Sequence, residues 1–371
     1  MMRVPVNEPL LDGNEKKYLA ECIDSGWISS EGPFVSAFEA GFSARVNRRH
    51  GVAVCNGTAA LDVAFEALDL GPGDEVIMPA FTIISCIGQI VRCGAKPVLV
   101  DTDPVTWNMD VSRLEALVTP RTRAVLVVHI YGLPVDMDPV LDLARRHGLR
   151  VIEDAAEMHG QTYRGQACGS FGDLSTFSFY PNKHITTGEG GMVVTDDDVL
   201  AETCRSLRNL CFESERRFVH ERLGWNFRMT NLQAAIGVAQ LERLDAFVSR
   251  KREMGRRYQE LLADLPGVQL PLDSTDYAAN IYWVFGMVLD DDRGLDAATV
   301  MRRLGERGVG TRPFFCPMHK QPVLRRAGLF GGESHPVAER LHRQGFYIPS
   351  GMALTESQAC VVVDALRAVL A

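Results

Sequence analysis

The segment LSTFSFYPNKHITTGEGGMVVTDD, residues 174–197, has an apolar run at each end and a turn between them that carries Lys183. The runs LSTFSFY and GGMVVTDD are typical of strands, and the small residues after Lys183 would let a flat ligand approach the backbone closely. A lysine in a turn is ordinarily a solvated charge. Burial or a neighbouring cation can instead lower its pKa, making it a nucleophilic amine that forms a Schiff base. Whether Lys183 is a solvated charge or a nucleophilic amine depends on the rest of the chain.

The same pattern extends on both sides of this segment. Short β-branched runs alternate with helix-length segments from about residue 52 to residue 196. Continuous apolar strands separated by helices are typical of a mostly parallel sheet that is covered on both faces. The sequence therefore predicts a large α/β domain, with strands in segments 52–56, 74–80, 96–103, 123–132, 149–157, 174–180 and 190–197.

A smaller α+β domain is predicted to follow. Apolar residues at helical spacing run through residues 230–264, which predicts one long helix that joins two domains, 1–240 and 241–371. Segment 281–290 is typical of a strand. Segment 296–308 is typical of a helix closed by Gly308, and a last helix should include 361–371.

Composition excludes several kinds of protein. The 371 residues carry a mild formal charge of -8, without a basic stretch that would suit nucleic acid or a membrane surface. The N-terminal residues show no signal-peptide core, and no apolar run is long enough to span a bilayer. The nine cysteines are scattered and never form CxxC, so we expect neither disulfides nor a metal site. A cytoplasmic enzyme or binding protein is expected.

The turn CNGTAAL, residues 55–61, follows the first strand and opens a helix. Gly57 allows a sharp turn, Thr58 can cap the helix, and the free N–H groups of a first helical turn suit a phosphate. An ordinary strand-to-helix turn with a good cap is the alternative interpretation.

The segment VIEDAAEMHG, residues 151–160, ends another strand with Glu153, Asp154, Glu157 and His159 close together. Ligands of open α/β sheets bind at the carboxyl ends of strands, so these residues are candidates for chemistry. Strand alternation puts Glu153 and Asp154 on opposite faces, so at most one of them faces a given ligand. The alternative is that these side chains cap the next element or lie in solvent.

Together, the three sites match the needs of pyridoxal phosphate. That cofactor requires an anion site, a carboxylate that keeps its pyridine nitrogen protonated, and an amine that binds its aldehyde. The protonated ring accepts the electrons released when the substrate loses a proton. Lys183, once released from the cofactor, is placed to move that proton as general acid and base.

The sequence also resembles a known family of enzymes. The segments GDEVIMPAFT (73–82), VIEDAAE (151–157), 171–197 and NFRMTNLQAAIGVAQLERLD (226–245) are similar to the DegT/DnrJ/EryC1/StrS nucleotide-sugar aminotransferases, which are pyridoxal phosphate enzymes of fold type I. The resemblance covers nearly the whole chain from about residue 25. It implies an aminotransferase that alternates between pyridoxal and pyridoxamine phosphate.

The resemblance also implies roles for single residues. It implies that Lys183 binds the cofactor covalently, that Asp154 faces the pyridine nitrogen and that Glu157, often glutamine in the family, faces the ring oxygen. Many members stack an aromatic residue on the ring where this chain has Ile83. The implied phosphate ligands are Gly57, Thr58 and Ser178, with Asn226 reaching the phosphate of the neighbouring subunit in a homodimer that shares its active sites.

A narrower resemblance concerns the substrate. Segments 12–32, 175–194 and 311–322 are similar to family members that convert GDP-4-keto-6-deoxymannose and L-glutamate into GDP-perosamine and 2-oxoglutarate. It implies a nucleotide-sugar pocket that includes Trp27, Arg312, Phe314, Phe315 and His319. His184 is a further candidate for this pocket, and the alternative is that it packs beside Lys183. An alternative is that the segment RPFF, residues 312–315, only packs between the two domains.

Three other functions stay open from the sequence. Relatives act on dTDP- or UDP-linked sugars or aminate C3. Related 3-dehydratases carry histidine in place of the lysine, and the presence of Lys183 favours transamination. A non-catalytic regulator could keep the same fold.

Overall fold

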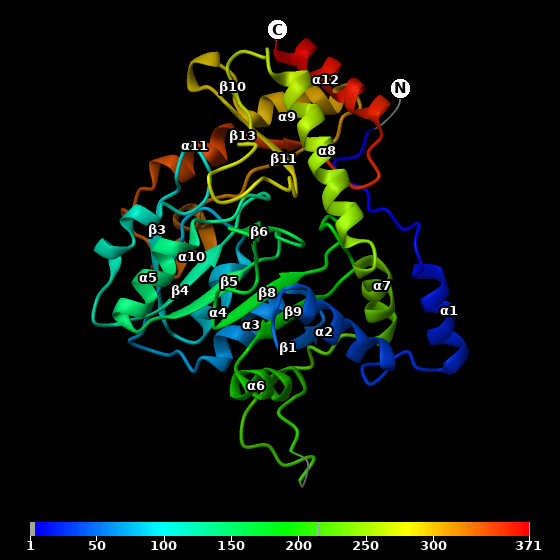
Figure 1. Cartoon of the computed structure of the whole chain (residues 1–371). Helices are drawn as coiled ribbons and strands as arrows, with labels where there is room; N and C mark the ends of the chain where they lie inside the picture. Colours follow the sequence, from blue (N-terminus) through cyan, green and yellow to red (C-terminus); the bar gives the residue numbers. More distant parts are fainter. Residues whose placement is uncertain (1–3, 214–215, 371) are drawn as a thin grey trace.

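The computed structural model describes residues 4–213 and 216–370, and it shows a larger and a smaller domain (Figure 1). The larger domain contains the early strands and helices, and the smaller one contains the C-terminal helix. The division into two domains near residue 240 stays a prediction, and residues 1–3, 214–215 and 371 lie outside the described residues.

A seven-stranded sheet forms the centre of the larger domain. Its spatial order is β1-β9-β8-β5-β4-β2-β3, and β9 runs antiparallel to both of its neighbours while the other pairs are parallel. The predicted mostly parallel sheet is confirmed. The strands are β1 (His50–Val54), β2 (Glu75–Pro79), β3 (Lys96–Val100), β4 (Thr122–Val128), β5 (Arg150–Asp154), β8 (Leu174–Ser178) and β9 (Gly191–Thr195).

Helices cover both faces of this sheet, as its apolar strands predict. Alternate residues of β4 belong to different cores: Val125 and Val127 pack with α2 and α5, whereas Ala124 and Leu126 pack with α3 and α4. The helix α6 packs with α3 against β1 and β9. These helices are α2 (Pro33–Arg45), α3 (Gly57–Ala67), α4 (Ser85–Arg92), α5 (Met137–His147) and α6 (Asp198–Arg208), and a small hairpin pairs β6 (Thr162–Tyr163) with β7 (Gln166–Ala167).

The smaller domain is built on an antiparallel sheet of order β10-β11-β13-β12. The strand expected at 281–290 is β11, and the expected helices are α9, which ends before Gly308 (φ 79°), and α12. The elements are β10 (Val268–Gln269), β11 (Phe285–Leu289), β12 (Arg312–Pro313), β13 (Gly345–Ile348), α9 (Ala297–Glu306), α10 (Pro322–Arg326), α11 (Pro336–Gln344) and α12 (Glu356–Leu370).

The predicted single helix over 230–264 is wrong, because two helices occupy this segment. They are α7 (Asn231–Leu241) and α8 (Leu244–Leu262), separated where Arg243 leaves helical geometry at φ -111° and ψ 5°. The side chains at the break bind the N-terminal segment: Glu242 accepts from Asn14 and Tyr18, and Arg243 pairs with Asp12. Consequently α7 packs on α2 and on α1 (Glu15–Ser25), while α8 continues toward the smaller domain (Figure 1).

Candidate active site

A cavity of about 670 Å³ lies where several strands of the large sheet end. Asp154 ends β5, Ser178 ends β8, and the first turn of α3 follows β1. All three line the cavity together with Lys183, and side chains from the smaller domain close one side of it. The tertiary structure therefore brings together the three sites that the sequence places far apart.

The start of α3 is capped by a different residue from the one expected. Asn56 is the N-cap, and its side chain accepts from the N–H of Ala59, whereas Thr58 is exposed and lines the cavity. A Cβ atom on Gly57 would lie 2.6 Å from the Cβ of Ser178, so glycine is required here by this close approach. The exposed Thr58 and the N-terminus of α3 thus form a cradle beside Ser178 that suits a phosphate.

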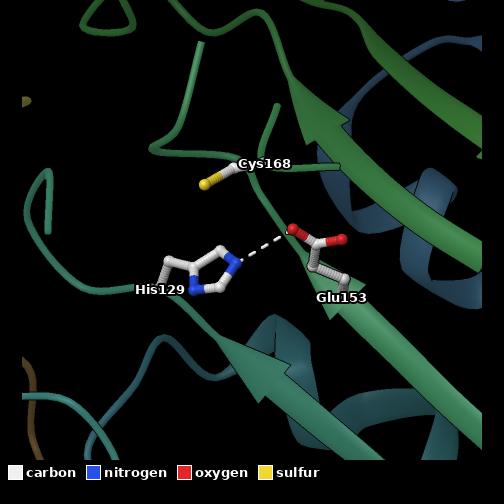
Figure 2. Close-up of side chains that lie close together, drawn as sticks. All are labelled: His129, Glu153 and Cys168. Atoms are coloured by element: carbon white, nitrogen blue, oxygen red, sulfur yellow. Dashed lines mark hydrogen bonds and ion pairs between the residues drawn. The ribbon is translucent and has the colours of Figure 1, made fainter. Parts of the chain in front are cut away.

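Glu153 points away from the cavity, as strand alternation predicts. Its carboxylate accepts from Gly169 N–H (2.5 Å), Phe171 N–H (3.0 Å) and Ser175 Oγ (3.1 Å). It also lies 3.0 Å from Nε2 of His129, with Cys168 nearby (Figure 2). Glu153, His129 and Ser175 thus form a buried hydrogen-bond network at the end of β5, with Cys168 packed beside it.

The ligand atoms of His129, Glu153 and Cys168 lie within 4.8 Å of one another, a spacing that could suit a metal ion. However, Nδ1 of His129 accepts from Val135 N–H, so its Nε2 carries a proton and donates to Glu153. Burial raises the pKa of the Cys168 thiol, which disfavours the thiolate that binds metals. The cluster in Figure 2 is therefore a structural network that supports the end of β5.

Asp154 faces the cavity and is itself almost completely buried, with 4% of its surface exposed. Its Oδ1 accepts from Ala156 N–H at 3.0 Å, and its Oδ2 lies 3.3 Å from the Sγ atom of Cys86. Burial raises the pKa of Asp154, while these hydrogen bonds and the charge of Lys183 oppose that increase. These two hydrogen bonds hold the carboxylate in one orientation.

Lys183 and Glu157 share the same buried space. The Nζ atom of Lys183 lies 3.8 Å from Oε1 of Glu157, and Oε2 of Glu157 accepts from Tyr131 N–H at 2.6 Å. Burial lowers the pKa of Lys183, although Glu157 and Asp154 favour its charged form. Burial raises the pKa of Glu157 to about 8. Lys183 is thus a buried amine whose pKa is lowered by burial, which its segment alone did not predict.

An indole ring covers the amine of Lys183. The Nζ atom lies 3.8 Å from the centre of the Trp283 ring, and the indole N–H donates to Asn182 O at 2.8 Å. Trp283, Phe315 and Tyr347 line the cavity from the smaller domain. Sequence reasoning missed Trp283 and Tyr347, because both belong to apolar segments that are indistinguishable from ordinary core strands.

Three residues expected in the substrate pocket lie elsewhere, which corrects the sequence interpretation. His184 is buried and its Nε2 lies 3.2 Å from Ile281 O, because the turn directs alternate side chains of this segment to opposite sides. Phe314 packs inside an aromatic cluster with Trp107 and Tyr131, so its neighbour Phe315 lines the cavity instead. His319 is buried against Glu339, at 2.8 Å.

Other expected residues lie outside the cavity of this chain or at its edge. Trp27 and Asn226 are exposed, and Oδ1 of Asn226 accepts from Arg228. Arg312 is exposed beside Tyr347, which it faces in the pairing of β12 with β13. Ile83 lines the cavity, with 46% of its surface exposed. Ile83 stays a candidate for an aliphatic contact with a cofactor ring, the alternative being that an aromatic side chain stacks there.

The residues present fit pyridoxal phosphate. The cradle of Gly57, Thr58 and Ser178 offers anion donors, and the carboxylate of Asp154 retains free lone pairs toward the cavity. Lys183 supplies a buried amine for the aldehyde, and Ile83 supplies an apolar surface for the ring. No helix in the described part of the chain combines the length and apolar character needed to cross a membrane.

Comparison with known proteins agrees with this geometry. The chain is 44% identical to GDP-perosamine synthase of Caulobacter vibrioides, over 99% of this chain and 98% of that protein. It is 38% identical to the dTDP-3-amino-3,4,6-trideoxy-α-D-glucose transaminase of Streptomyces venezuelae, over 94% and 90% of the two chains. The crystal structure of S. venezuelae DesV in complex with a ketimine intermediate matches with a TM-score of 0.90 at 36% identity, over 100% and 99% of the two chains.

These likenesses confirm the expected fold type I architecture and the expected family. The family pattern matches residues 9–367, which is nearly the whole chain. The chain belongs to the DegT/DnrJ/EryC1/StrS aminotransferase family.

Proposed function

We propose that this protein is a pyridoxal phosphate-dependent aminotransferase that transfers the amino group of L-glutamate to C4 of GDP-4-keto-6-deoxymannose, forming GDP-perosamine. One observation carries the reaction type: Lys183, Asp154 and the first turn of α3 line the same cavity. Similarity to GDP-perosamine synthase supports the choice of sugar and nucleotide. When bound, the cofactor supplies an aldehyde for amines and a ring that accepts electrons.

The residues of the chain divide the work of holding this cofactor. The cradle of Gly57, Thr58 and Ser178 binds the phosphate, and Asp154 keeps the pyridine nitrogen protonated. Glu157 lies between Lys183 and the backbone of Tyr131, so it is placed to face the ring oxygen. These contacts orient the ring before any substrate enters.

Lys183 acts first as the covalent anchor and then as the acid and base. Burial lowers its pKa, so the amine loses its proton more readily than in water, and once neutral it can accept a proton from the substrate carbon and return it to the neighbouring carbon. Trp283 covers the amine and limits the access of water to it. The two half-reactions use the same lysine, first with glutamate and then with the keto sugar.

The substrates are anionic, which supports a homodimer. Among the described residues that line the cavity, Lys183 is the sole lysine or arginine. A glutamate carboxylate and a nucleotide diphosphate need further cations, and a partner subunit would supply them. Exposed apolar side chains suited to such an interface are Trp27, Ile28, Ile84, Phe218 and Leu223. We still predict that three exposed residues contact the cofactor or the substrate in that assembly. They are Asn226, Trp27 and Arg312.

An amination assay tests this function. The purified protein is incubated with glutamate and a panel of GDP-, dTDP- and UDP-linked 4-keto-6-deoxy sugars, and product mass is measured. We expect nitrogen in the product of the GDP sugar, with the position of the amine at C4 by nuclear magnetic resonance. A reaction confined to a dTDP sugar would overturn the perosamine assignment but not the aminotransferase.

A second candidate function is amination at C3 of a dTDP-linked sugar. The similarity to the S. venezuelae transaminase supports it. The same panel separates it through the position of the new amine. The presence of Lys183 in the cavity, near Glu157, favours transamination over a dehydratase reaction. A product without nitrogen would identify that reaction.

A further inference from the structure

Cys86, in the first turn of α4, is a buried thiol that the proposed chemistry does not use. Its Sγ atom lies 3.3 Å from Oδ2 of Asp154 and 3.3 Å from Oγ1 of Thr82. Cys86 has no exposed surface, Thr82 has 1% and Asp154 has 4%. The three side chains thus form a buried chain of contacts in which Thr82 and Asp154 also line the cavity, whereas Cys86 does not.

The direction of these hydrogen bonds follows from the acceptor. An ionised carboxylate can only accept, so the Cys86 thiol donates to Asp154, and the sulfur accepts from the Thr82 hydroxyl. The other oxygen of Asp154 accepts from Ala156 N–H. Both oxygens are therefore tied from within the protein, which leaves their remaining lone pairs to face the cavity.

The type of donor matters as much as its position. A thiol is a weak hydrogen-bond donor, whereas a hydroxyl is a strong one. A weak donor fixes the rotamer of Asp154 but takes little of its negative charge. The charge stays available to a cationic group in the cavity, where burial makes each charge interaction stronger.

We propose that Cys86 is a positioning residue that holds Asp154 toward the pyridine nitrogen of the cofactor while leaving the carboxylate its charge. This inference rests on the proposed function, because it needs pyridoxal phosphate bound against Asp154. It adds a residue that touches neither cofactor nor substrate. Its effect passes through the carboxylate alone.

Three variants of the full-length protein test the role. Cys86→Ala removes the donor, Cys86→Ser replaces it with a stronger one, and Cys204→Ala removes an equally buried thiol in α6 that lies outside the cavity lining. Pyridoxal phosphate affinity is measured for each protein. We expect about threefold to tenfold weaker binding for Cys86→Ala, as for the loss of one modest hydrogen bond, and little change for Cys204→Ala.

A spectroscopic measurement separates positioning from packing. Pyridoxal phosphate labelled with nitrogen-15 in its ring reports the protonation of the pyridine nitrogen. Cys86→Ala should shift this signal toward the unprotonated ring, since a carboxylate that is no longer held toward the pyridine nitrogen supports its proton less. Cys86→Ser should restore the orientation of the carboxylate but take more of its charge, so its signal should lie between those of Cys86→Ala and the wild type. The infrared S–H band of Cys86 in the holoenzyme, found by difference from Cys86→Ala, should show a hydrogen-bonded thiol.

The outcomes that would overturn the inference are distinct. Equal affinity and an equal nitrogen signal in Cys86→Ala and the wild type would show that Cys86 only packs. Equal weakening in Cys86→Ala and Cys204→Ala would assign the effect to lost core volume. Failure of the wild-type protein to bind pyridoxal phosphate would overturn the proposed function itself, and with it the inference.

Discussion

Two lysines of this protein, Lys183 and Lys251, bury their amines in different surroundings. The side chain of Lys183 is 10% exposed, and its amine lies near Glu157 and under the Trp283 ring in the large cavity. Lys251, in α8, is 3% exposed and donates to the backbone oxygens of Trp283 and Ser350. Burial lowers the pKa of both amines, and that of Lys251 falls to about 7.

The comparison shows that a lowered pKa alone does not identify a catalytic lysine. Lys251 uses its protons to join α8 to two backbone carbonyls, so its amine has a structural role. Lys183 faces a cavity that contains a carboxylate and the start of a helix. The difference is the open space beside the amine and the groups that surround it.

Of the substitutions that test this comparison, Lys183→Ala should have the largest effect on activity. Loss of both the covalent anchor and the acid–base group should lower the transamination rate by about 10⁴-fold. Lys251→Met, in contrast, should still form the coloured complex with pyridoxal phosphate. Absorbance spectra and a glutamate half-reaction assay measure both. A Lys183→Ala protein that turns over would refute the assigned role.

Asp154→Asn tests the partner that Lys183 has and Lys251 lacks. An amide cannot keep the pyridine nitrogen protonated, so the rate should fall by about 10²- to 10³-fold, as when one electrostatic contact to a developing charge is lost. Stopped-flow absorbance after addition of glutamate measures this rate. A rate within about twofold of the wild type would show that Asp154 has no such role.

Lys251→Met tests the structural role of Lys251 through the pH dependence of the free energy of unfolding. The folded-state pKa of Lys251 is lowered to about 7 from 10.5, so between these values the unfolded chain binds more protons. The stability of the wild type should thus rise with pH across this range relative to Lys251→Met, by at most about 1.4 kcal/mol per pH unit. Urea unfolding at pH 7, 8 and 9 measures the difference. A difference that is independent of pH would contradict the prediction.

Glu157→Gln should have the smallest effect. Because the pKa of Glu157 is raised to about 8, its carboxyl group is mostly neutral at pH 7, and glutamine can still accept from Tyr131 N–H. We expect activity within about threefold of the wild type at pH 7, and a larger difference at pH 9, where the wild-type carboxyl group is ionised and the glutamine stays neutral. A pH–rate profile of both proteins checks this. Parallel profiles would show that Glu157 does not titrate in this range.

The sequence determined the elements whose signals are local. Continuous β-branched runs such as 123–132 predicted the parallel strands, because a strand buried on both faces needs apolar residues throughout. Alternation predicted that Glu153 and Asp154 face opposite sides, and the structure confirms it. The chemistry of Lys183 emerged when three separate turns were combined, since open α/β sheets gather strand ends at one edge.

Only the tertiary structure decided what depends on distant contacts. The break between α7 and α8 follows from the contacts of Glu242 and Arg243 with the N-terminal segment, which no periodicity of 230–264 reveals. Likewise His184 turns into the interior, and Trp283 enters the cavity from the smaller domain. Amino-acid order specifies local geometry, whereas the sharing of one cavity by two domains is set by packing between residues far apart in the chain.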